Sequence, residues 1–175
     1  MDSQKRSKSG SHAANIGIAN EHIALGILMQ KYNASKVDLP SSKFDIILLH
    51  KKKYIRIQAK TSHPNISFKG NVRAGKANKG ASDPNFGFRY DRTHCDILMG
   101  VKSNFNNIGE LLGVDLFFLP TILVEKISNS NGVSTNCLGA LKYNYEILEK
   151  CDDENFILKK VKEYQEKGSV KINLK

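Results

Sequence analysis

The stretch from Phe44 to Thr61, FDIILLHKKKYIRIQAKT, constrains the fold of this chain more than any other. Its first part is almost entirely apolar, and after a basic turn apolar and polar residues alternate with a period of two. That period is typical of a β-strand, so we expect two strands paired as a hairpin across His50, Lys51 and Lys52. Because the first strand is apolar on both faces, it is predicted to lie inside a sheet covered by helices on both sides.

The second strand of this hairpin has a polar face. Tyr54, Arg56, Gln58 and Lys60 alternate with apolar residues and therefore share one side of the strand. Pairing across the hairpin brings Asp45 beside Gln58, with Lys60 one pleat further along. A carboxylate and neighbouring oxygens can hold Mg²⁺ or Mn²⁺, and a lysine can orient an attacking water, which together predict phosphodiester hydrolysis. The alternative is an ordinary strand whose polar face is solvated.

The chain is strongly basic. It has 27 Lys and Arg residues against 17 Asp and Glu, a formal net charge of +10 at pH 7. Such an excess favours a polyanionic partner, most often nucleic acid. An acidic membrane surface could also attract this charge, but the sequence has no basic amphipathic helix with a bulky apolar face, so no membrane partner is expected.

Length, cysteines and apolar runs limit the class of protein. The 175 residues suffice for a core of its own, and we expect a single nuclease domain over residues 13–175 with its core at 13–125. The three cysteines lack disulfide-framework or zinc-finger spacing and are interpreted as free thiols in a reducing compartment. With no apolar run of about 20 residues and no signal-peptide pattern, a cytoplasmic, nucleoid-associated protein is expected.

Two N-terminal segments differ in composition. Residues 1–12 are polar, basic and rich in Ser, and we expect a disordered arm there. From Ala13 to about Tyr32 apolar residues recur at helical spacing, which predicts a helix with Glu21 at the edge of its apolar arc. The arm is interpreted either as a solvated tail or as a contact to a phosphate backbone. Its basic residues are Lys5, Arg6 and Lys8.

A long basic loop is predicted over residues 62–89. It is rich in Gly, Asn and Ser, has no sustained period, and follows the polar strand directly. A loop that wraps DNA and a solvated insertion are both open interpretations. Two aromatic residues, Phe68 and Phe86, are interleaved with its basic residues. Its expected DNA contacts are Lys69, Arg73, Lys76 and Lys79.

The remaining elements are predicted from shorter patterns. Asp96 heads one strand and is interpreted as a residue that caps a turn rather than as a metal ligand. A capped amphipathic helix follows Asp152 and Asp153 within a C-terminal helical extension at 140–168. The other predicted elements are strands at 37–39, 95–101 and 114–119, a strand or short helix at 122–127, and a loop at 128–134.

Three features, taken in order, resemble the core of the PD-(D/E)xK nuclease superfamily: Glu21 on a first helix, Asp45 at the start of a strand, and the triplet QAK at 58–60 on the next strand. The triplet is similar to the QxK variant of some restriction enzymes and of group I intron-encoded homing endonucleases. The likeness spans most of residues 14–120. It implies a restriction-endonuclease-like α/β fold with a central mixed β-sheet flanked by helices.

The resemblance also implies a role for each site residue. Asp45 is the principal metal ligand, Gln58 ligates through its side-chain oxygen, and Ala59 ligates through its carbonyl. Glu21 supports the metal directly or through water, and Lys60 orients or polarises the attacking water. Gln58 stands where most members have a carboxylate, which removes one negative charge that Glu21 could restore. Phe44 stands where the motif has a proline. Ser42, just before the motif, is a candidate phosphate contact.

These inferences lead to one leading hypothesis and two alternatives. The leading hypothesis is a Mg²⁺-dependent endonuclease that hydrolyses duplex DNA, with Mn²⁺ as a substitute metal. Because a single site cuts one strand, we expect a homodimer or higher homo-oligomer. A Holliday-junction resolvase of the same fold is the first alternative, and a non-catalytic nucleic-acid-binding module is the second.

Overall fold

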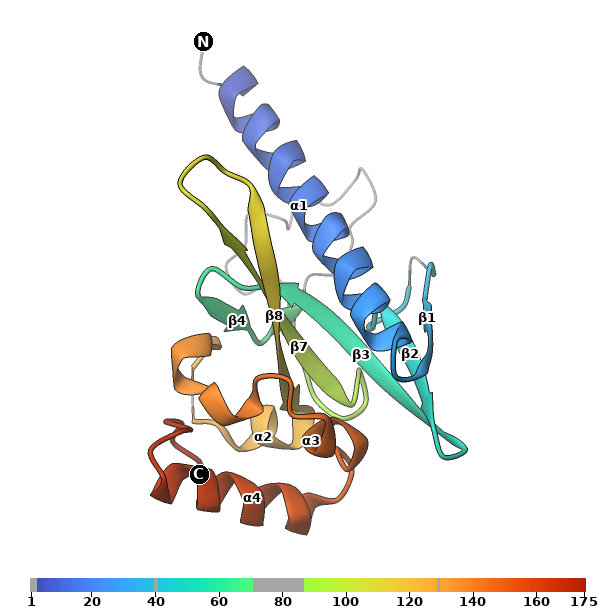
Figure 1. Cartoon of the computed structure of the whole chain (residues 1–175), viewed down its shortest axis with the longest axis vertical. Coiled ribbons are helices and arrows are strands. Elements are labelled where there is room, and N and C mark those ends of the chain that lie inside the picture. The colour runs from blue at the N-terminus through green and yellow to red at the C-terminus, as the bar shows by residue number, and fades with distance from the viewer. Residues whose placement is uncertain (1–2, 40, 71–86, 129) are drawn as a thin grey trace.

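A five-stranded mixed sheet forms the centre of the structure (Figure 1). The computed structural model describes residues 3–39, 41–70, 87–128 and 130–175. The strand order is β1-β2-β3-β7-β8; β3 and β7 run parallel, and the other neighbours are antiparallel. The predicted mixed sheet is therefore confirmed. Its strands are β1 (Asn33–Lys36), β2 (Ile46–His50), β3 (Lys53–Thr61), β7 (Ile97–Phe105) and β8 (Leu111–Pro120).

The β2–β3 hairpin has the register that the sequence predicted. Its two central turn residues, at 51–52, have φ of 46° and 68°, the left-handed conformation of a two-residue turn that matches the twist of paired strands. Ile46 pairs with Ile57 across the hairpin. Asp45 and Gln58, the next residues along each strand, are therefore cross-strand neighbours. β2 lies between β1 and β3, so it is an internal strand, as predicted.

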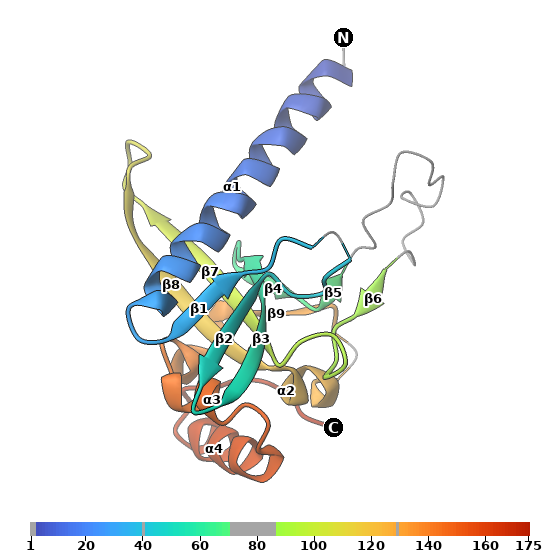
Figure 2. The same ribbon diagram turned by 90° about the vertical axis from the view of Figure 1, so that its right-hand side faces the viewer.

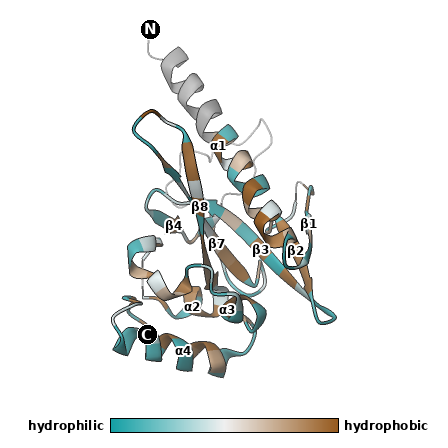
Figure 3. Cartoon of the chain, viewed as in Figure 1, coloured by the Kyte–Doolittle hydropathy of each residue, from teal (hydrophilic) through white to brown (hydrophobic). Residues whose placement is uncertain are grey.

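Helix α1 (Ser3–Met29) covers one face of the sheet (Figures 1 and 2). Its C-terminal half packs Ala24 and Leu28, both fully buried, against apolar side chains of β2, β3 and β7. Figure 3 shows apolar residues along this half of the helix, where it crosses the sheet. Burial of this apolar stripe anchors the helix.

The start of α1 differs from the prediction. The helix begins at Ser3, whereas we expected a start near Ala13 and a disordered arm before it. Gln, Lys and Arg recur in this segment and have high helix propensity, and lengthening an anchored helix is much easier than nucleating a new one. The added turns project beyond the sheet (Figure 2). The side chains of the arm's basic residues lie outside the described part of the structure, so their contact with phosphates stays a prediction.

Helices α2 (Thr121–Lys126) and α4 (Glu154–Glu166) cover the opposite face. Alternate residues of β7 divide between the two faces: Met99 joins the cluster around α1, and Leu98 packs in the cluster that contains Ile157 of α4. Helices therefore flank the sheet on both sides, as predicted. The remaining C-terminal elements are two short 3-10 helices, Thr135–Cys137 and Gly139–Leu141, and α3 (Tyr145–Glu149).

The segment predicted as a long loop contains short strands. β4 (Asn65–Ser67) pairs with β9 (Gly132–Ser134), part of another predicted loop, and β5 (Lys69–Gly70) pairs with β6 (Phe88–Arg89). Strands this short have no readable period and depend on partners far along the chain. Phe68, which the prediction placed in this loop, is a fully buried core residue. The expected contacts Arg73, Lys76 and Lys79, with Phe86, fall outside the described residues.

Other predicted bounds change less. The strand expected at 37–39 lies at 33–36 as β1, because its position depends on antiparallel pairing with β2 rather than on its own apolar residues. The segment at 122–127 adopts the helical option, as α2. Asp153 caps α4 by accepting a hydrogen bond from the backbone N–H of Phe156 at 3.0 Å, as predicted.

Two predictions concern the chain as a whole. Cys95, Cys137 and Cys151 are free thiols, and the first and last of them are buried. Across the described residues, the structure contains no helix with the length and apolar character needed to span a membrane.

Candidate active site

One pocket at the rim of the sheet gathers the predicted site residues. It has a volume of about 390 Å³ and is bordered by α1, the connection between β1 and β2, β3, and the β5–β6 pair. Glu21, Asp45, Gln58, Ala59 and Lys60 all line it. The first helix and the two strands of the hairpin therefore bring their predicted site residues into one pocket. The other lining residues are Ser42, Lys43, Lys69, Phe88 and Tyr90.

Three polar groups converge where β2 begins and β3 nears its end. The side-chain nitrogen Nε2 of Gln58 donates to Oδ2 of Asp45 and to the carbonyl oxygen of Ala59, the latter at 3.0 Å. The backbone N–H of Ala59 donates to the same Asp45 oxygen at 2.9 Å. Gln58 is only 8% exposed, so its amide has little room to move away. The Asp45 and Ala59 oxygens thus both face the end of the Gln58 side chain.

These groups fit a hard divalent cation. Mg²⁺ prefers oxygen ligands, is held by one or two carboxylates, and keeps several of its waters. Asp45 and Ala59 supply two oxygens that face one atom, and a half-turn of the Gln58 amide would exchange its nitrogen for an oxygen there. Glu21 adds a second carboxylate to the pocket wall. Among the described residues, no group of three or more His, Cys, Asp or Glu side chains is placed to hold a metal ion.

Lys60 lies on the same pocket wall. Burial lowers the pKa of its ammonium below the ordinary 10.5, and the nearby carboxylates of Asp45 and Glu21 partly oppose this shift. Its Nζ lies 4.8 Å from the centre of the Tyr90 ring, a cation–π contact. The Lys60 amine therefore loses its proton more readily than an ordinary lysine and is oriented by an aromatic face.

A buried amide fixes α1 beside β3. Asn20 is 3% exposed; it donates to Oγ1 of Thr61 at 3.1 Å and accepts from Oγ of Ser103 at 2.7 Å. The next residue, Glu21, lines the pocket and lies 3.9 Å from the Lys36 ammonium. Asn20 is not among the site residues predicted from the sequence. The signal was present, because this polar residue stands at helical spacing within the apolar stripe of α1.

The predicted phosphate contacts differ in their surroundings. Ser42 lines the pocket, but its hydroxyl donates to the Phe44 carbonyl at 2.7 Å and accepts from the Phe44 amide at 3.2 Å. Its hydroxyl therefore stabilises the connection into β2. Lys69 is exposed on β5 and lines the pocket. The contact of each with DNA stays a prediction.

Arg56, on the polar face of β3, lies outside the pocket lining. Its guanidinium forms two bonds with the Asp96 carboxylate, Nη2–Oδ1 at 2.8 Å and Nε–Oδ2 at 3.1 Å, and its backbone N–H donates to the same carboxylate at 2.8 Å. The hydrogen bonds that its guanidinium donates to Asp96 raise the pKa of Arg56. Asp96 thus has a structural role, but as a link between β3 and the start of β7 rather than as the predicted cap of a turn.

Comparison with known proteins gives one informative result. The sequence matches no protein-family model and no curated protein. The structure is similar to the solved structure of a bacterial homing endonuclease, I-Ssp6803I, with a TM-score of 0.56 and 8% sequence identity, over 78% of this chain and 93% of that chain. The fold resembles that of a bacterial homing endonuclease. This likeness to the homing endonuclease confirms the predicted fold class; at such low identity it concerns the fold alone.

Three pocket residues were not anticipated: Lys43, Phe88 and Tyr90. The rings of Phe88 and Tyr90 meet edge to face, 5.0 Å apart, beside the residues that the homing-endonuclease resemblance had singled out. Only folding brings them there, because β6 lies far along the chain from the β2–β3 hairpin. A weak signal exists in the run FGFRY, whose aromatic residues alternate as in a strand.

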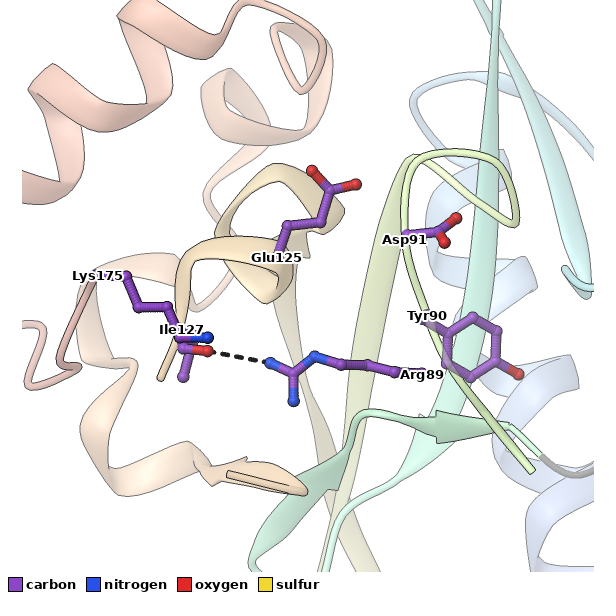
Figure 4. A pocket seen from close by; sticks show the side chains of 6 residues that line it. All are labelled: Arg89, Tyr90, Asp91, Glu125, Ile127 and Lys175. Atoms are coloured by element: carbon purple, nitrogen blue, oxygen red, sulfur yellow. Dashed lines mark hydrogen bonds between the residues drawn. The ribbon is translucent and has the colours of Figure 1, made fainter. Parts of the chain in front are cut away.

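A second pocket, of about 330 Å³, lies beside α2 (Figure 4). Arg89 donates from Nη2 to the carbonyl of Ile127 at 3.1 Å, which ties β6 to the end of α2. Glu125 is paired with Arg92 at 2.9 Å, and Asp91 accepts hydrogen bonds within its own turn. Because these charged groups serve neighbouring protein groups, we assign no chemistry to this pocket.

Proposed function

We propose that the chain is a metal-dependent DNA endonuclease with an active site of the PD-(D/E)xK type in its QxK form. The observation that carries the proposal is the convergence of the Asp45 carboxylate, the Ala59 carbonyl and the Gln58 amide in one pocket with Lys60. The likeness of the fold to a bacterial homing endonuclease supports DNA as the substrate. The net charge of +10 favours the same polyanion.

Each site residue has one task in this proposal. Bound Mg²⁺ or Mn²⁺ supplies a Lewis acid that neutralises charge developing on the phosphate and acidifies a water. Asp45 and the Ala59 carbonyl would hold the metal, and Gln58 would be a third ligand through its side-chain oxygen. Glu21 adds a second carboxylate, directly or through water. Lys60 orients the attacking water, and its lowered pKa raises the fraction of neutral amine that can take up a proton at Nζ.

Cleavage of supercoiled plasmid tests the proposal. We expect the wild-type protein to cut with Mg²⁺ or Mn²⁺ and not with EDTA. Asp45→Asn and Lys60→Met should each cut roughly 10²-fold more slowly or worse, because each removes a group with a direct role. Both should still bind DNA. Lys31→Met removes one positive charge on α1's C-terminal side, outside the pocket lining, and is the matched control that should cut as wild type. Unchanged cutting by Asp45→Asn would contradict the assigned site.

The products of the same assay report on assembly. A single site hydrolyses one strand, so we propose that duplex cleavage uses a homodimer or higher homo-oligomer. Linear product formed without accumulation of nicked circles would support paired sites. Nicked circles as the final product would contradict them. Four-way junctions compared with linear duplex in the same assay test the junction-resolvase alternative.

One observation favours a second candidate, a nucleic-acid-binding module without hydrolysis. Since the described residues include no group of three His, Cys, Asp or Glu side chains placed to hold a metal ion, metal binding would depend on two carboxylates and neutral oxygens. This candidate predicts salt-sensitive DNA binding and no product at any metal concentration. Calorimetry with Mg²⁺ or Mn²⁺, on wild type and on Asp45→Asn, separates the two candidates.

A further inference from the structure

Two lysines of the pocket are held by two neighbouring aromatic rings. The Lys43 Nζ lies 4.6 Å from the centre of the Phe88 ring, and the Lys60 Nζ lies 4.8 Å from the centre of the Tyr90 ring. The rings themselves are 5.0 Å apart in an edge-to-face contact. All four side chains line the same pocket. The second cation, Lys43, has no role in the proposed chemistry so far.

The Phe88 ring is fixed by its surroundings. It stacks on the imidazole of His94 at 4.4 Å between ring centres, with the planes 24° apart. On another side it lies against Gly70, its partner in the β5–β6 pair, where any added Cβ atom would collide with the ring. Tyr90, the ring's edge-to-face neighbour, is 4% exposed. Packing on several sides therefore holds the ring under Lys43.

An aromatic face holds a lysine differently from a carboxylate. Several lysine ammoniums elsewhere in the described part of the chain pair with carboxylates, as in Lys126–Glu154 and Lys142–Asp115, both at 2.8 Å. Such a pair cancels the charge and uses N–H donors. A ring quadrupole attracts the ammonium but leaves its net charge in place. Lys43 is thus oriented while its positive charge stays available to an anion in the pocket.

We infer that Lys43 is a substrate-binding residue of this site, which contacts a backbone phosphate of the bound DNA strand, and that Phe88 is its positioning residue. This inference rests on the proposed function, because it takes the pocket to receive a DNA strand. Lys43 is two residues before Asp45, so its charge acts close to the phosphate that the site would hydrolyse. Lys43 would therefore offset part of the negative charge on that phosphate.

The salt dependence of DNA binding tests the Lys43 contact. Binding of the full-length protein to a labelled duplex oligonucleotide is measured by fluorescence anisotropy in EDTA, so that no cleavage interferes. The logarithm of the affinity falls as the logarithm of the salt concentration rises, and each lost phosphate contact makes this slope shallower by about 0.9. We expect Lys43→Met to lose about that much slope and to bind roughly tenfold more weakly. Lys43→Arg should keep the wild-type slope.

The chain offers a matched control for this substitution. Lys31 also lies over an aromatic ring, that of Tyr145 at 4.3 Å, but it does not line the pocket. Lys31→Met removes the same charge and a contact of the same kind, so it should keep the wild-type slope. Equal slopes for Lys43→Met and Lys31→Met would overturn the inference.

A double-mutant cycle tests the positioning role of Phe88. Phe88→Leu should weaken DNA binding in the wild-type background and have little further effect when Lys43 is already Met, because the ring acts through that lysine. The methyl group added by Gly70→Ala would collide with the Phe88 ring and displace it. This variant should therefore show the same loss of DNA binding with Phe88 itself unchanged. Circular dichroism melts establish that each variant is folded. Additive losses from Phe88→Leu and Lys43→Met would overturn the positioning role.

Failure of this inference can be told apart from failure of the proposed function. Cleavage with Mg²⁺ or Mn²⁺ is measured on the same preparations. If the wild-type protein cuts DNA and the Lys43→Met slope equals that of the control, the Lys43 contact is wrong and the endonuclease stands. If the slope falls as expected and no preparation cuts at any metal concentration, the endonuclease is wrong and the phosphate contact stands. A wild-type protein that does not bind DNA overturns both.

Discussion

Gln58 donates a hydrogen bond from its side-chain amide to the carboxylate of Asp45, its cross-strand neighbour in the β2–β3 hairpin. The bond satisfies a buried amide and at the same time occupies a carboxylate oxygen. In the proposed site a cation must compete with this amide for Asp45. A carboxylate at position 58 would attract the cation instead, so we expect the glutamine to lower metal affinity and to stabilise the metal-free protein.

Gln58→Glu should therefore bind Mg²⁺ more tightly and be less stable without it. Loss of the bond to Asp45 and repulsion between two carboxylates should lower the free energy of unfolding by about 1–3 kcal/mol in EDTA. Thermal unfolding with and without Mg²⁺ measures both effects. Gln58→Leu is the control, since it loses the bond without gaining a charge. A Gln58→Glu melting temperature no more responsive to Mg²⁺ than that of wild type would contradict a ligand role for this position.

The stability of the protein should depend on pH through Lys60. Burial lowers its pKa in the folded state, so between that lowered pKa and 10.5 the unfolded chain binds more protons than the folded chain. The cost of burying the ammonium is fully present below the lowered pKa and is lost as pH rises toward 10.5. Lys60→Met should therefore be more stable than wild type at neutral pH, by an amount that shrinks in alkaline solution. Urea unfolding of both proteins across this range measures it; a pH-independent difference would speak against the shift.

Asp96→Asn should destabilise the fold without changing the chemistry. Its carboxylate takes two bonds from the Arg56 guanidinium and one from a backbone N–H, so we expect a loss of about 1.5–3 kcal/mol in the free energy of unfolding. Asp115→Asn is the control, because it breaks an ion pair with the more exposed Lys142 and should cost about 1 kcal/mol or less. Urea unfolding gives both values. An equal loss of unfolding free energy in the two variants would show that the Arg56–Asp96 pair stabilises the fold no more than the Lys142–Asp115 pair does.

Asn20→Ala should affect both stability and metal dependence. It leaves the Thr61 and Ser103 hydroxyls without the Asn20 amide and should cost about 1–3 kcal/mol. Because Asn20 fixes this turn of α1 on the sheet, its loss should also let Glu21 move and raise the Mg²⁺ concentration needed for half-maximal cleavage. His22→Ala, an exposed change on the same helix, is the control. If a folded Asn20→Ala variant needed the same Mg²⁺ concentration as wild type, the proposed support of the metal by Glu21 would be contradicted.

The outcome for each site residue follows from how far apart in the chain its contacts lie. Asp45 and Gln58 belong to one hairpin, whose register depends on a two-residue turn and on side-chain alternation, and both are local properties. Their proximity was therefore predictable. Phe88 reaches the pocket because β6 pairs with β5, and the weak alternation around a strand of two residues does not predict which strand it pairs with.

By itself, the sequence determined the central hairpin, its polar face, the apolar stripe that places α1 on the sheet, and the basic charge, because each of these depends on neighbouring residues or on composition. The tertiary structure alone decided which residues surround that polar face: Asn20 between α1 and the sheet, and Phe88 and Tyr90 beside Lys43 and Lys60. The physical reason is that these contacts join segments distant in the chain. Their geometry depends on how two packed faces and several short strands fit together, and no local periodicity records that fit.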